Sequence, residues 1–361
     1  HHGSAHFLRG MATELMLRGH EVRIFEPVNA WSTQHLLADH GVSALEGFYH
    51  AYPHLRSTRY TLDSLDLDAT LEEIDLVIAH EWNDPQLIAW LGQHHAHHHR
   101  GLLLFHDTHH RAASAPEAMA GYRLSAYDGA LTCGRVVRDL YLSHNWARSA
   151  WTWHEAADVR LFHPRRDQPI EGDVVWIANW GQGHHAQQIE EFLVRPVRDL
   201  KLRARVYGVH YPPDVLAMLK QAGIAYSGWL PNYRVPQVLA RHRAAVHIPR
   251  SCYASQLPGV PTIRPFEALA CGTPLVCAPW DDAEHLFTPG RDYLLAHDSR
   301  EMAQHLHRLL DQPAQAARLA QHGLHTIHQR HTCGHRVDDL MELCRRFGLD
   351  VRSSQPDRPA A

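Results

Sequence analysis

The feature that most constrains the fold of this chain is a regular alternation of short apolar runs and helical segments, which is clearest at residues 247–280. An apolar run there ends at Pro249, and a loop rich in proline and glycine follows. A helix comes next that Pro265 opens and Gly272 closes, before a second apolar run. Proline at the first position and glycine just past the end are typical helix limits. Short buried strands alternating with helices predict a parallel α/β sheet with right-handed crossovers.

The same alternation runs through both halves of the chain. In the first half we expect strands at residues 21–26, 75–80, 101–106 and 127–133, helices at 5–18 and 85–95, and a mixed region at 31–71. In the second half we expect strands at residues 173–178, 203–209, 224–228, 244–249, 274–278 and 293–296, with helices at 187–200, 213–222, 235–242, 265–272, 300–311, 313–331 and 335–347. This alternation is typical of doubly wound, Rossmann-like domains.

A chain of 361 residues is too long for one ordinary domain. The polar, proline-bearing stretch at residues 162–172 marks a boundary. We therefore expect an N-terminal domain at residues 1–165 and a C-terminal domain at residues 166–350, whose last helices could cross back to the first domain. A disordered tail is expected at residues 351–361.

The beginning of the chain is unusual for a doubly wound domain. A strand and a glycine-bearing turn normally precede the first helix. Here the turn is present at Gly3 to His6, but the strand is absent. The first residues could be the remnant of a tag, or a native first strand could be missing. We favour the second interpretation because Gly3 and His6 stand where a turn facing a phosphate or an acceptor would place them.

Composition excludes several classes of protein. No run approaches the ~18 apolar residues of a membrane span, and no signal peptide is recognisable. The six cysteines form no C-x-x-C pair, which indicates free thiols in a cytosolic protein. A net charge of -4 gives no reason to expect a nucleic-acid partner. The 34 histidines include a run at residues 94–99, which admits a metal-binding interpretation. We prefer the simpler one, histidine at a helix C-terminus, and expect no metal site.

Residues suited to chemistry follow the predicted strands. They are His106 and Asp107, Gly181, Gly228 and Trp229, Arg250, and the pair Arg264 and Glu267. Ligands of doubly wound domains bind at the carboxyl ends of the strands. If the two domains face one another along these edges, the ligand lies in a cleft between them.

Residues 261–276, with the sequence PTIRPFEALACGTPLV, resemble the GT-B glycosyltransferases, and within them the family 4-related, CgeB-like (spore-maturation-protein type) group. The resemblance extends over residues 228–231, 246–250 and 286–293, whereas the first half matches only in architecture and at a few residues. It implies two Rossmann-like domains facing a central cleft. It also implies transfer of a sugar from a nucleoside-diphosphate sugar, bound mainly by the second domain.

In this family the glutamate that matches Glu267 accepts hydrogen bonds from the ribose hydroxyls of the nucleotide. A carboxylate suits this role because it only accepts and can bind two hydroxyl groups. The alternative is that Glu267 merely complements the dipole in the first turn of its helix. A second family carboxylate, eight residues earlier, is replaced here by Gly259. Backbone N–H groups of the loop at residues 257–262 could take its place, because glycine permits close approach.

The donor diphosphate needs positive charge, for which Arg264, Arg250 and the helix N-terminus are candidates. The alternative for Arg250 is an internal salt bridge to Asp281 or Asp282. Many relatives carry a basic residue after the first strand of this domain, but the stretch around Gly181 has none, so binding there would use backbone N–H groups.

The resemblance places the nucleotide base near Gly228, Trp229 and Leu230, where Trp229 could either stack on the base or pack in the core. For acid–base chemistry the candidates are His106 and His109, with Asp107 orienting either ring. The alternative is a loop that is rich in histidine for no catalytic reason.

Asp66 and Asp68 resemble the D-x-D of metal-dependent sugar transferases, but a solvated, charged loop is the better interpretation. The sequence thus predicts a metal-independent cytosolic glycosyltransferase without a cofactor. It would bind a nucleotide-sugar donor and an acceptor that is a glycan, a protein or a small molecule. A sugar-nucleotide epimerase of the same fold and a non-catalytic nucleotide-sugar binder are the alternatives.

Overall fold

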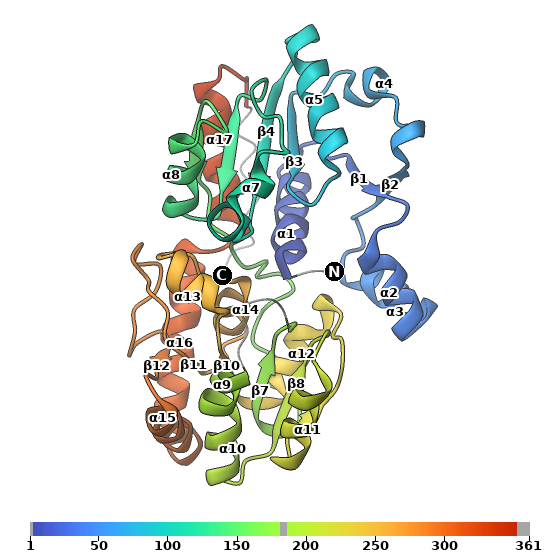
Figure 1. Ribbon diagram of the computed structural model, residues 1–361. Coiled ribbons are helices and arrows are strands. Elements are labelled where there is room, and N and C mark those ends of the chain that lie inside the picture. The colour runs from blue at the N-terminus through green and yellow to red at the C-terminus, as the bar shows by residue number, and fades with distance from the viewer. Residues whose placement is uncertain (1–2, 181–185, 352–361) are drawn as a thin grey trace. The chain divides into compact units, whose positions relative to one another are not determined.

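The computed structural model divides into two compact units, and each contains segments from both ends of the chain (Figure 1). The structure describes residues 3–180 and 186–351. The unit called the C unit here consists of His1–Phe7 and Ala156–Thr332, and the N unit consists of Leu8–Glu155 and Cys333–Ala361. The division at Glu155 lies earlier than the limit of residue 165 expected from the sequence. The predicted tail, apart from its first residue, lies outside the described residues.

The C unit is built on a six-stranded parallel sheet of order β12-β11-β10-β7-β8-β9. Its strands are β7 (Gly172–Ile177), β8 (Ala204–Tyr207), β9 (Ala225–Tyr226), β10 (His242–His247), β11 (Leu275–Cys277) and β12 (Leu294–Leu295). Strand β7 pairs with β8 on one side and β10 on the other. The order of strands along the chain therefore reverses between β7 and β10, which is the switch point at which doubly wound sheets bind ligands.

Ten helical segments accompany this sheet among the described residues. They are α9 (Ala186–Ile189), η2 (Glu190–Val194), α10 (Arg195–Asp199), α11 (Pro213–Gln221), η3 (Asn232–Arg234), α12 (Val235–Ala240), α13 (Ser251–Gln256), α14 (Ile263–Ala270), α15 (Ser299–Asp311) and α16 (Pro313–Arg330). The helix predicted at residues 187–200 contains the π-helical turn η2 just before Pro196, since proline donates no N–H and interrupts regular pairing. The loop predicted before residue 265 contains α13.

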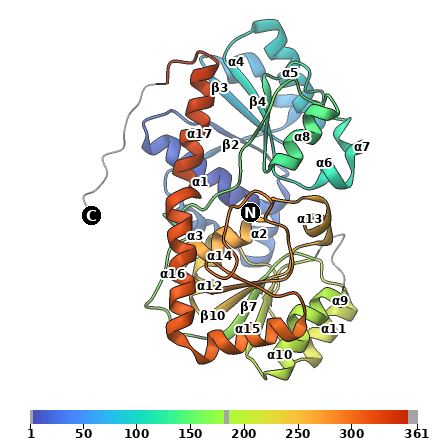
Figure 2. The ribbon, with the colours of Figure 1, turned by 90° about the vertical axis from the view of Figure 1, so that its left-hand side faces the viewer.

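One core cluster of the C unit lies on one face of the sheet, and buried residues such as Val175 and Leu275 occupy the other face. In this core cluster, Trp176 of β7 and Val206 of β8 are buried against Phe192 and Met302 from the surrounding helices. Each fully buried side chain of this size contributes about 1.5–3 kcal/mol to folding. Helices α12 and α16 each pack on α14, and Figure 2 shows α16 running beside α14. The first turn of α15 is capped, because Asp298 accepts a hydrogen bond from the N–H of Glu301 at 2.8 Å.

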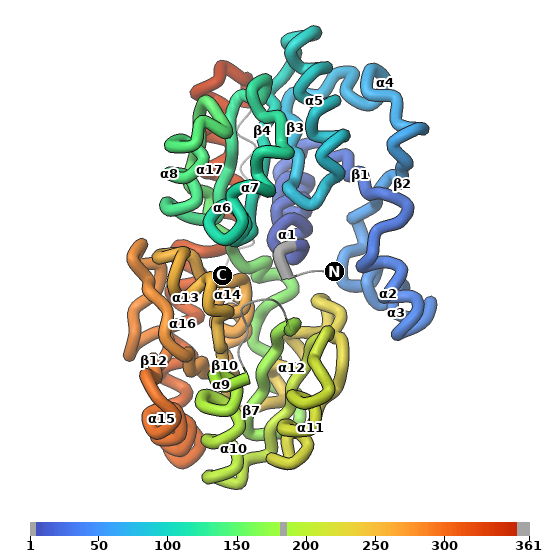
Figure 3. Tube along the Cα trace, viewed as in Figure 1, coloured from blue at the N-terminus to red at the C-terminus, as the bar shows by residue number. Residues whose placement is uncertain are grey.

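The N unit has two parallel sheets in place of the single sheet expected, β1-β2 and β3-β4-β5-β6. Its strands are β1 (Ile24–Pro27), β2 (Ser57–Tyr60), β3 (Leu76–His80), β4 (Leu102–Asp107), β5 (Gly129–Thr132) and β6 (Ala150–Thr152). Its helices are α2 (Trp31–His40), α3 (Val42–Ala51), η1 (Leu62–Ser64), α4 (Leu67–Leu71), α5 (Pro85–His98), α6 (Arg111–Ser114), α7 (Pro116–Met119), α8 (Arg135–Ser143) and α17 (Cys333–Arg346). Helix α8 packs on β5 and β6. Helix α6 packs on α7 and on α8, and Figure 3 shows the chain trace through these three helices.

Helices α1 (Gly3–Leu17) and α17 lie where the chain passes from one unit to the other. Helix α1 begins among the residues of the C unit and continues into the N unit. Helix α17 belongs to the N unit, where the indole N–H of Trp153 donates to the carbonyl oxygen of Arg336 at 3.0 Å. All six cysteines are buried and free, which confirms the prediction of free thiols. None of the described helices has the length and apolar character that crossing a membrane requires.

Candidate active site

The candidate site of the C unit is organised by helix α14, which differs in register from the prediction. It begins at Ile263, and the hydroxyl of Thr262 accepts a hydrogen bond from the N–H of Arg264 at 3.4 Å. Pro265 is therefore the third helical residue, a position in the first turn that proline tolerates. Glu267 lies in the second turn, beyond the reach of a first-turn dipole effect. The dipole alternative for Glu267 is thus wrong.

Glu267 is buried, with an exposed fraction of 1%, and its carboxylate has three partners. The Oε1 atom accepts from Nδ2 of Asn232 at 2.7 Å and from Nδ1 of His6 at 3.2 Å, while Oε2 pairs with the guanidinium of Arg264. Burial acts to raise the pKa of Glu267, but the charge of Arg264 and the hydrogen bonds from His6 and Asn232 outweigh it, so the pKa is lowered. The group is a buried carboxylate held in its ionised form.

Both ring nitrogens of His6 have partners. Its Nε2 atom accepts a hydrogen bond from the backbone N–H of Asp158 at 2.8 Å, and its Nδ1 atom lies 3.2 Å from Oε1 of Glu267. The ring also stacks on Phe162 with centroids 3.9 Å apart. The predicted turn facing a phosphate or an acceptor is thus wrong, because Gly3 and His6 are helical and both ring nitrogens of His6 are engaged within the C unit.

Arg250 lies at the switch point of the sheet. It follows β10, and its Nη2 atom donates to the carbonyl oxygen of Asn179, which follows β7, at 3.5 Å. Among the residues that the structure describes, no carboxylate pairs with this guanidinium, so the predicted alternative of a salt bridge to Asp281 or Asp282 is wrong. Asp282 instead accepts hydrogen bonds from the N–H groups of two later residues at 2.9 and 2.8 Å. The positive charge of Arg250 is therefore available to a ligand.

The remaining donor-side predictions have mixed outcomes. Trp229 is buried, with an exposed fraction of 8%, which favours core packing over stacking on a base. Gly228 and Leu230 flank it and are both half-buried. The N–H of Gly259 donates to the carbonyl oxygen of Asp281 at 2.7 Å, so it is not free to bind a sugar as predicted. Gly181 lies outside the described residues.

A carboxylate nevertheless stands beside Gly259. A Cβ atom at this position would lie 2.5 Å from Cγ and 2.9 Å from Oε1 of Glu284. Glycine therefore makes room for a half-buried glutamate that comes from elsewhere in the sequence.

In the N unit His106 and Asp107 end strand β4, and His109 follows it. The carboxylate of Asp107 accepts from the hydroxyl of Tyr141 at 2.7 Å and from the backbone N–H of His109 at 2.9 Å. His106 is fully buried, and burial together with the nearby His80 ring lowers its pKa well below the usual value, so it is neutral. Only His109 of the predicted set is partly exposed.

Glu81, which the sequence analysis missed, is the centre of this edge. Its Oε1 atom accepts from the backbone N–H of Thr108 at 2.8 Å and its Oε2 atom from Arg111 at 2.8 Å. Burial and the adjacent charge of Asp107, to which Glu81 is hydrogen-bonded, raise the pKa of Glu81 well above its ordinary value. As the pH rises, these two carboxyl groups therefore keep a shared proton to a higher pH than two solvated carboxyl groups would.

The comparisons with known proteins agree with this architecture. Residues 186–342 match the protein-family model described as "Glycosyl transferase-like". Among solved structures, HepE of Anabaena, crystallised with UDP and glucose, is 14% identical with a TM-score of 0.63, covering 94% of this chain and 96% of that chain. A sucrose-phosphate synthase of Thermosynechococcus elongatus is 16% identical with a TM-score of 0.58, covering 82% and 84% of the two chains. The chain has the GT-B glycosyltransferase fold.

The predicted α/β GT-B fold is thereby confirmed, whereas the CgeB-like subgroup stays a prediction. A putative UDP-N-acetylglucosamine 2-epimerase of Listeria monocytogenes shares this GT-B fold, with 10% identity, a TM-score of 0.58 and coverage of 97% and 95% of the two chains. No curated protein sequence is significantly similar to this chain.

Two polar residues of this GT-B chain were missed although the sequence carried a signal for each. Asn232 directly follows the Gly-Trp-Leu-Pro motif, and Glu81 directly follows the last residue of a predicted strand. A polar residue that immediately follows a buried strand or motif lies at the edge where ligands bind. For Glu284 no local signal exists, because it approaches Gly259 only in the folded chain.

The carboxyl pair of the N unit makes the stability of the protein depend on pH. Because the pKa of Glu81 is raised in the folded state, the native chain binds more protons than the unfolded chain above the ordinary glutamate pKa, about 4.3. Stability is therefore lost as the pH rises through this window, by up to about 1.4 kcal/mol per pH unit. Glu81→Gln has no such proton to lose. We expect the melting temperature of the wild type to fall relative to that of the variant between about pH 5 and pH 8. A constant difference over this range would contradict the raised pKa.

Proposed function

We propose that this protein is a glycosyltransferase that binds a nucleoside-diphosphate sugar in its C unit and transfers the sugar to an acceptor hydroxyl. The observation that carries the proposal is Glu267, which lies on α14, the helix that precedes β11. It is a buried carboxylate that hydrogen bonds from His6 and Asn232 and the charge of Arg264 keep ionised. Folding a charge into the interior costs stability unless it is fully paired. A binding role for the carboxylate accounts for its place near the ligand-binding edge of the sheet.

Glu267 is assigned to the ribose and the two arginines to the diphosphate. The side chain of Arg264 covers Oε2 of Glu267 and is 24% exposed, so it has room to move. When it turns to the diphosphate, Oε2 becomes free to accept the ribose hydroxyls. Asn232 and His6 remain on Oε1 and hold the carboxylate in place. Arg250, at the switch point, supplies the second positive charge for the leaving group.

Uridine diphosphate is the first nucleotide to test. HepE, which has the same fold, was crystallised with UDP and with UDP-glucose. We assign the acid–base role to His109, the partly exposed member of the predicted set, and we propose that the arginines do the work that a metal ion does in other transferases.

The test is a binding and product assay with the whole chain. A panel of nucleoside diphosphates is screened for a rise in melting temperature, and the matching UDP-, GDP- or ADP-sugar is then incubated with and without a set of acceptors. We expect one nucleotide to stabilise the protein and its sugar to appear on an acceptor. If no nucleotide or nucleotide sugar is bound or consumed, the proposal is wrong.

The same assay separates the alternatives. The Listeria neighbour shows that the GT-B fold alone does not distinguish transfer from epimerisation. Conversion of the donor into a second sugar nucleotide without an acceptor would establish an epimerase and overturn transfer. Binding without any turnover would establish a non-catalytic binder.

A further inference from the structure

The histidine run at the end of α5 places two of its rings beside one carboxylate. His94 and His98 stand four positions apart, so they lie on the same face of the helix. The Nε2 atom of His94 lies 3.0 Å from Oδ1 of Asp68, and that of His98 lies 3.4 Å from the same oxygen. Asp68 comes from α4, and all three residues belong to the N unit. Two imidazoles from one helix therefore converge on a carboxylate from another.

The neighbouring side chains fix this arrangement. His95 turns to a different partner, Asp128, at 3.1 Å, and Asp128 also accepts the N–H of Leu103 in β4 at 2.7 Å. The apolar side of α5, with Ile88 and Leu91, is buried, and His94 and His98 face α4. On the other side, Asp66 caps α4 by accepting the N–H of Ala69 at 3.1 Å, which places Asp68 in the first turn.

An ordinary surface hydrogen-bond cluster does not require such convergence. The side chain of Asp68 is 79% exposed, so water could satisfy it completely. Its Oδ1 atom nevertheless lies within reach of both rings, and the three candidate ligand atoms lie within 4.8 Å of one another. Ligand atoms about 2.0–2.2 Å from a common zinc ion are separated by comparable distances.

We propose that Asp68, His94 and His98 form a binding site for one divalent transition-metal ion of the zinc class. Two neutral imidazoles and one carboxylate are a donor set that suits zinc and its neighbours better than magnesium or calcium, which prefer oxygen ligands. The ion would take the Nε2 lone pairs of the two neutral imidazoles, with each ring proton on Nδ1, and one carboxylate oxygen of Asp68. Three protein ligands leave a fourth position for water. The earlier expectation that the histidine run binds no metal is replaced by this proposal.

The site is separate from the residues assigned to the reaction. It borders a hollow of about 470 Å³ whose lining includes Leu102 and Leu103, at the amino end of β4. The carboxyl pair of the N unit lies at the opposite, carboxyl end of the same strands. We therefore assign the ion a structural role, joining α4 to α5.

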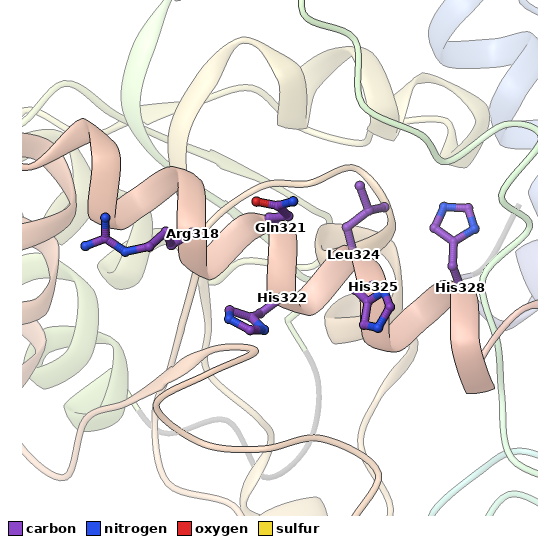
Figure 4. A pocket seen from close by; sticks show the side chains of 6 residues that line it. All are labelled: Arg318, Gln321, His322, Leu324, His325 and His328. Carbon is purple, nitrogen blue, oxygen red and sulfur yellow. The ribbon is translucent and has the colours of Figure 1, made fainter.

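Other histidines of the chain provide a control. On α16, His322, His325 and His328 line a pocket together with Arg318, Gln321 and Leu324 (Figure 4). These histidines do not form a group of three ligand atoms that lie within 4.8 Å of one another. Among the described residues, only Asp68, His94 and His98 form such a group. Exposed histidines in general are thus distinguishable from the proposed site.

The test is a titration of the full chain with Zn²⁺ and with Co²⁺, followed by calorimetry and by the visible absorption of bound Co²⁺. Adjacent residues give a matched pair of variants, His98→Ala at the site and His97→Ala beside it. We expect one tight equivalent of metal in the wild type and in His97→Ala. Affinity should fall at least tenfold in His98→Ala, His94→Ala and Asp68→Asn, with loss of the Co²⁺ absorption.

The double variant His322→Ala/His325→Ala should bind metal like the wild type. If His97→Ala or this double variant weakens binding as much as His98→Ala, the assignment is wrong. The assignment is also wrong if the wild type binds the metal no more tightly than His98→Ala, His94→Ala and Asp68→Asn do. Melting curves without metal check that each variant is folded, and nothing in the outcome depends on donor binding.

Discussion

Glu267→Ala is expected to abolish binding of a nucleoside diphosphate and to destabilise the protein by about 3 kcal/mol or more. The substitution leaves Asn232 and His6 without their acceptor in the interior and leaves Arg264 without its counter-ion. Each buried donor without a partner costs about 1–3 kcal/mol. The ribose would also lose the only acceptor proposed for it.

A second variant separates binding from stability. Glu267→Gln keeps one amide oxygen that can accept hydrogen bonds from Asn232 and His6. Its NH₂ group only donates, so it can accept hydrogen bonds neither from the ribose hydroxyls nor from Arg264. We expect a smaller loss of stability and the same loss of binding. The readout is the shift in melting temperature caused by the nucleotide. In the wild type a nucleotide at a hundred times its dissociation constant adds about 2.7 kcal/mol.

Glu342→Ala is the matched control. Glu342 lies on α17, its side chain is 55% exposed, and it pairs with Arg345 and Arg346. Such surface pairs contribute little, about 0–1 kcal/mol. An equal nucleotide shift in the wild type and in Glu267→Gln would refute the ribose assignment, even if transfer activity itself were established.

Gly208→Ala is expected to cause the largest loss of stability of any single change discussed for this chain, about 4 kcal/mol or more. Gly208 follows β8 with a φ of +152°, which side chains rarely adopt, and an added Cβ would lie 1.8 Å from the carbonyl oxygen of Ala178. That oxygen belongs to the backbone that follows β7. The N–H of Ala178 is bonded to the oxygen of Tyr207 at 2.9 Å, and the N–H of Gly208 is bonded to the oxygen of Gly228 at 2.8 Å. Neither segment can move away without breaking the sheet edge.

Gly223→Ala provides the comparison. Gly223 also has a positive φ, +72°, but nothing lies within 4 Å of an added Cβ. Its replacement should therefore cost only about 1 kcal/mol, the usual penalty for this backbone conformation. Unfolding midpoints of both variants measure the difference. Similar losses in the two variants would show that the contact with Ala178 is relieved at little cost.

The parallel sheet of the C unit could be predicted because its signals are local. Strands such as β7 and β11 contain short apolar runs. The residues that follow such strands indicate the edge of the sheet where ligands bind. Glu267 could be singled out because its motif is contiguous in the sequence. The register of α14 was predicted wrongly because Thr262, three residues before Pro265, caps the helix, which therefore begins at Ile263.

The partners of Glu267 could not be predicted in the same way. His6 and Glu267 are separated by 261 positions, and no periodicity connects residues so far apart. The same holds for Glu284 and Gly259, which approach one another through the fold of a loop. In the N unit, the pKa of Glu81 is raised by its own burial and by Asp107, which the neighbouring strand β4 brings beside it. Such contacts depend on tertiary structure, whereas strand and helix signals do not.

The hydrogen bond between His6 and Glu267 also bears on how the protein is made. A ribosome adds about 5–20 residues per second, so 261 positions correspond to roughly 13 to 50 s between the appearance of the two partners. During that time His6 has no partner at Glu267. The C unit is therefore completed only when this earlier segment closes onto a carboxylate synthesised 261 positions later, and the N unit is completed later still, because it includes Cys333–Ala361.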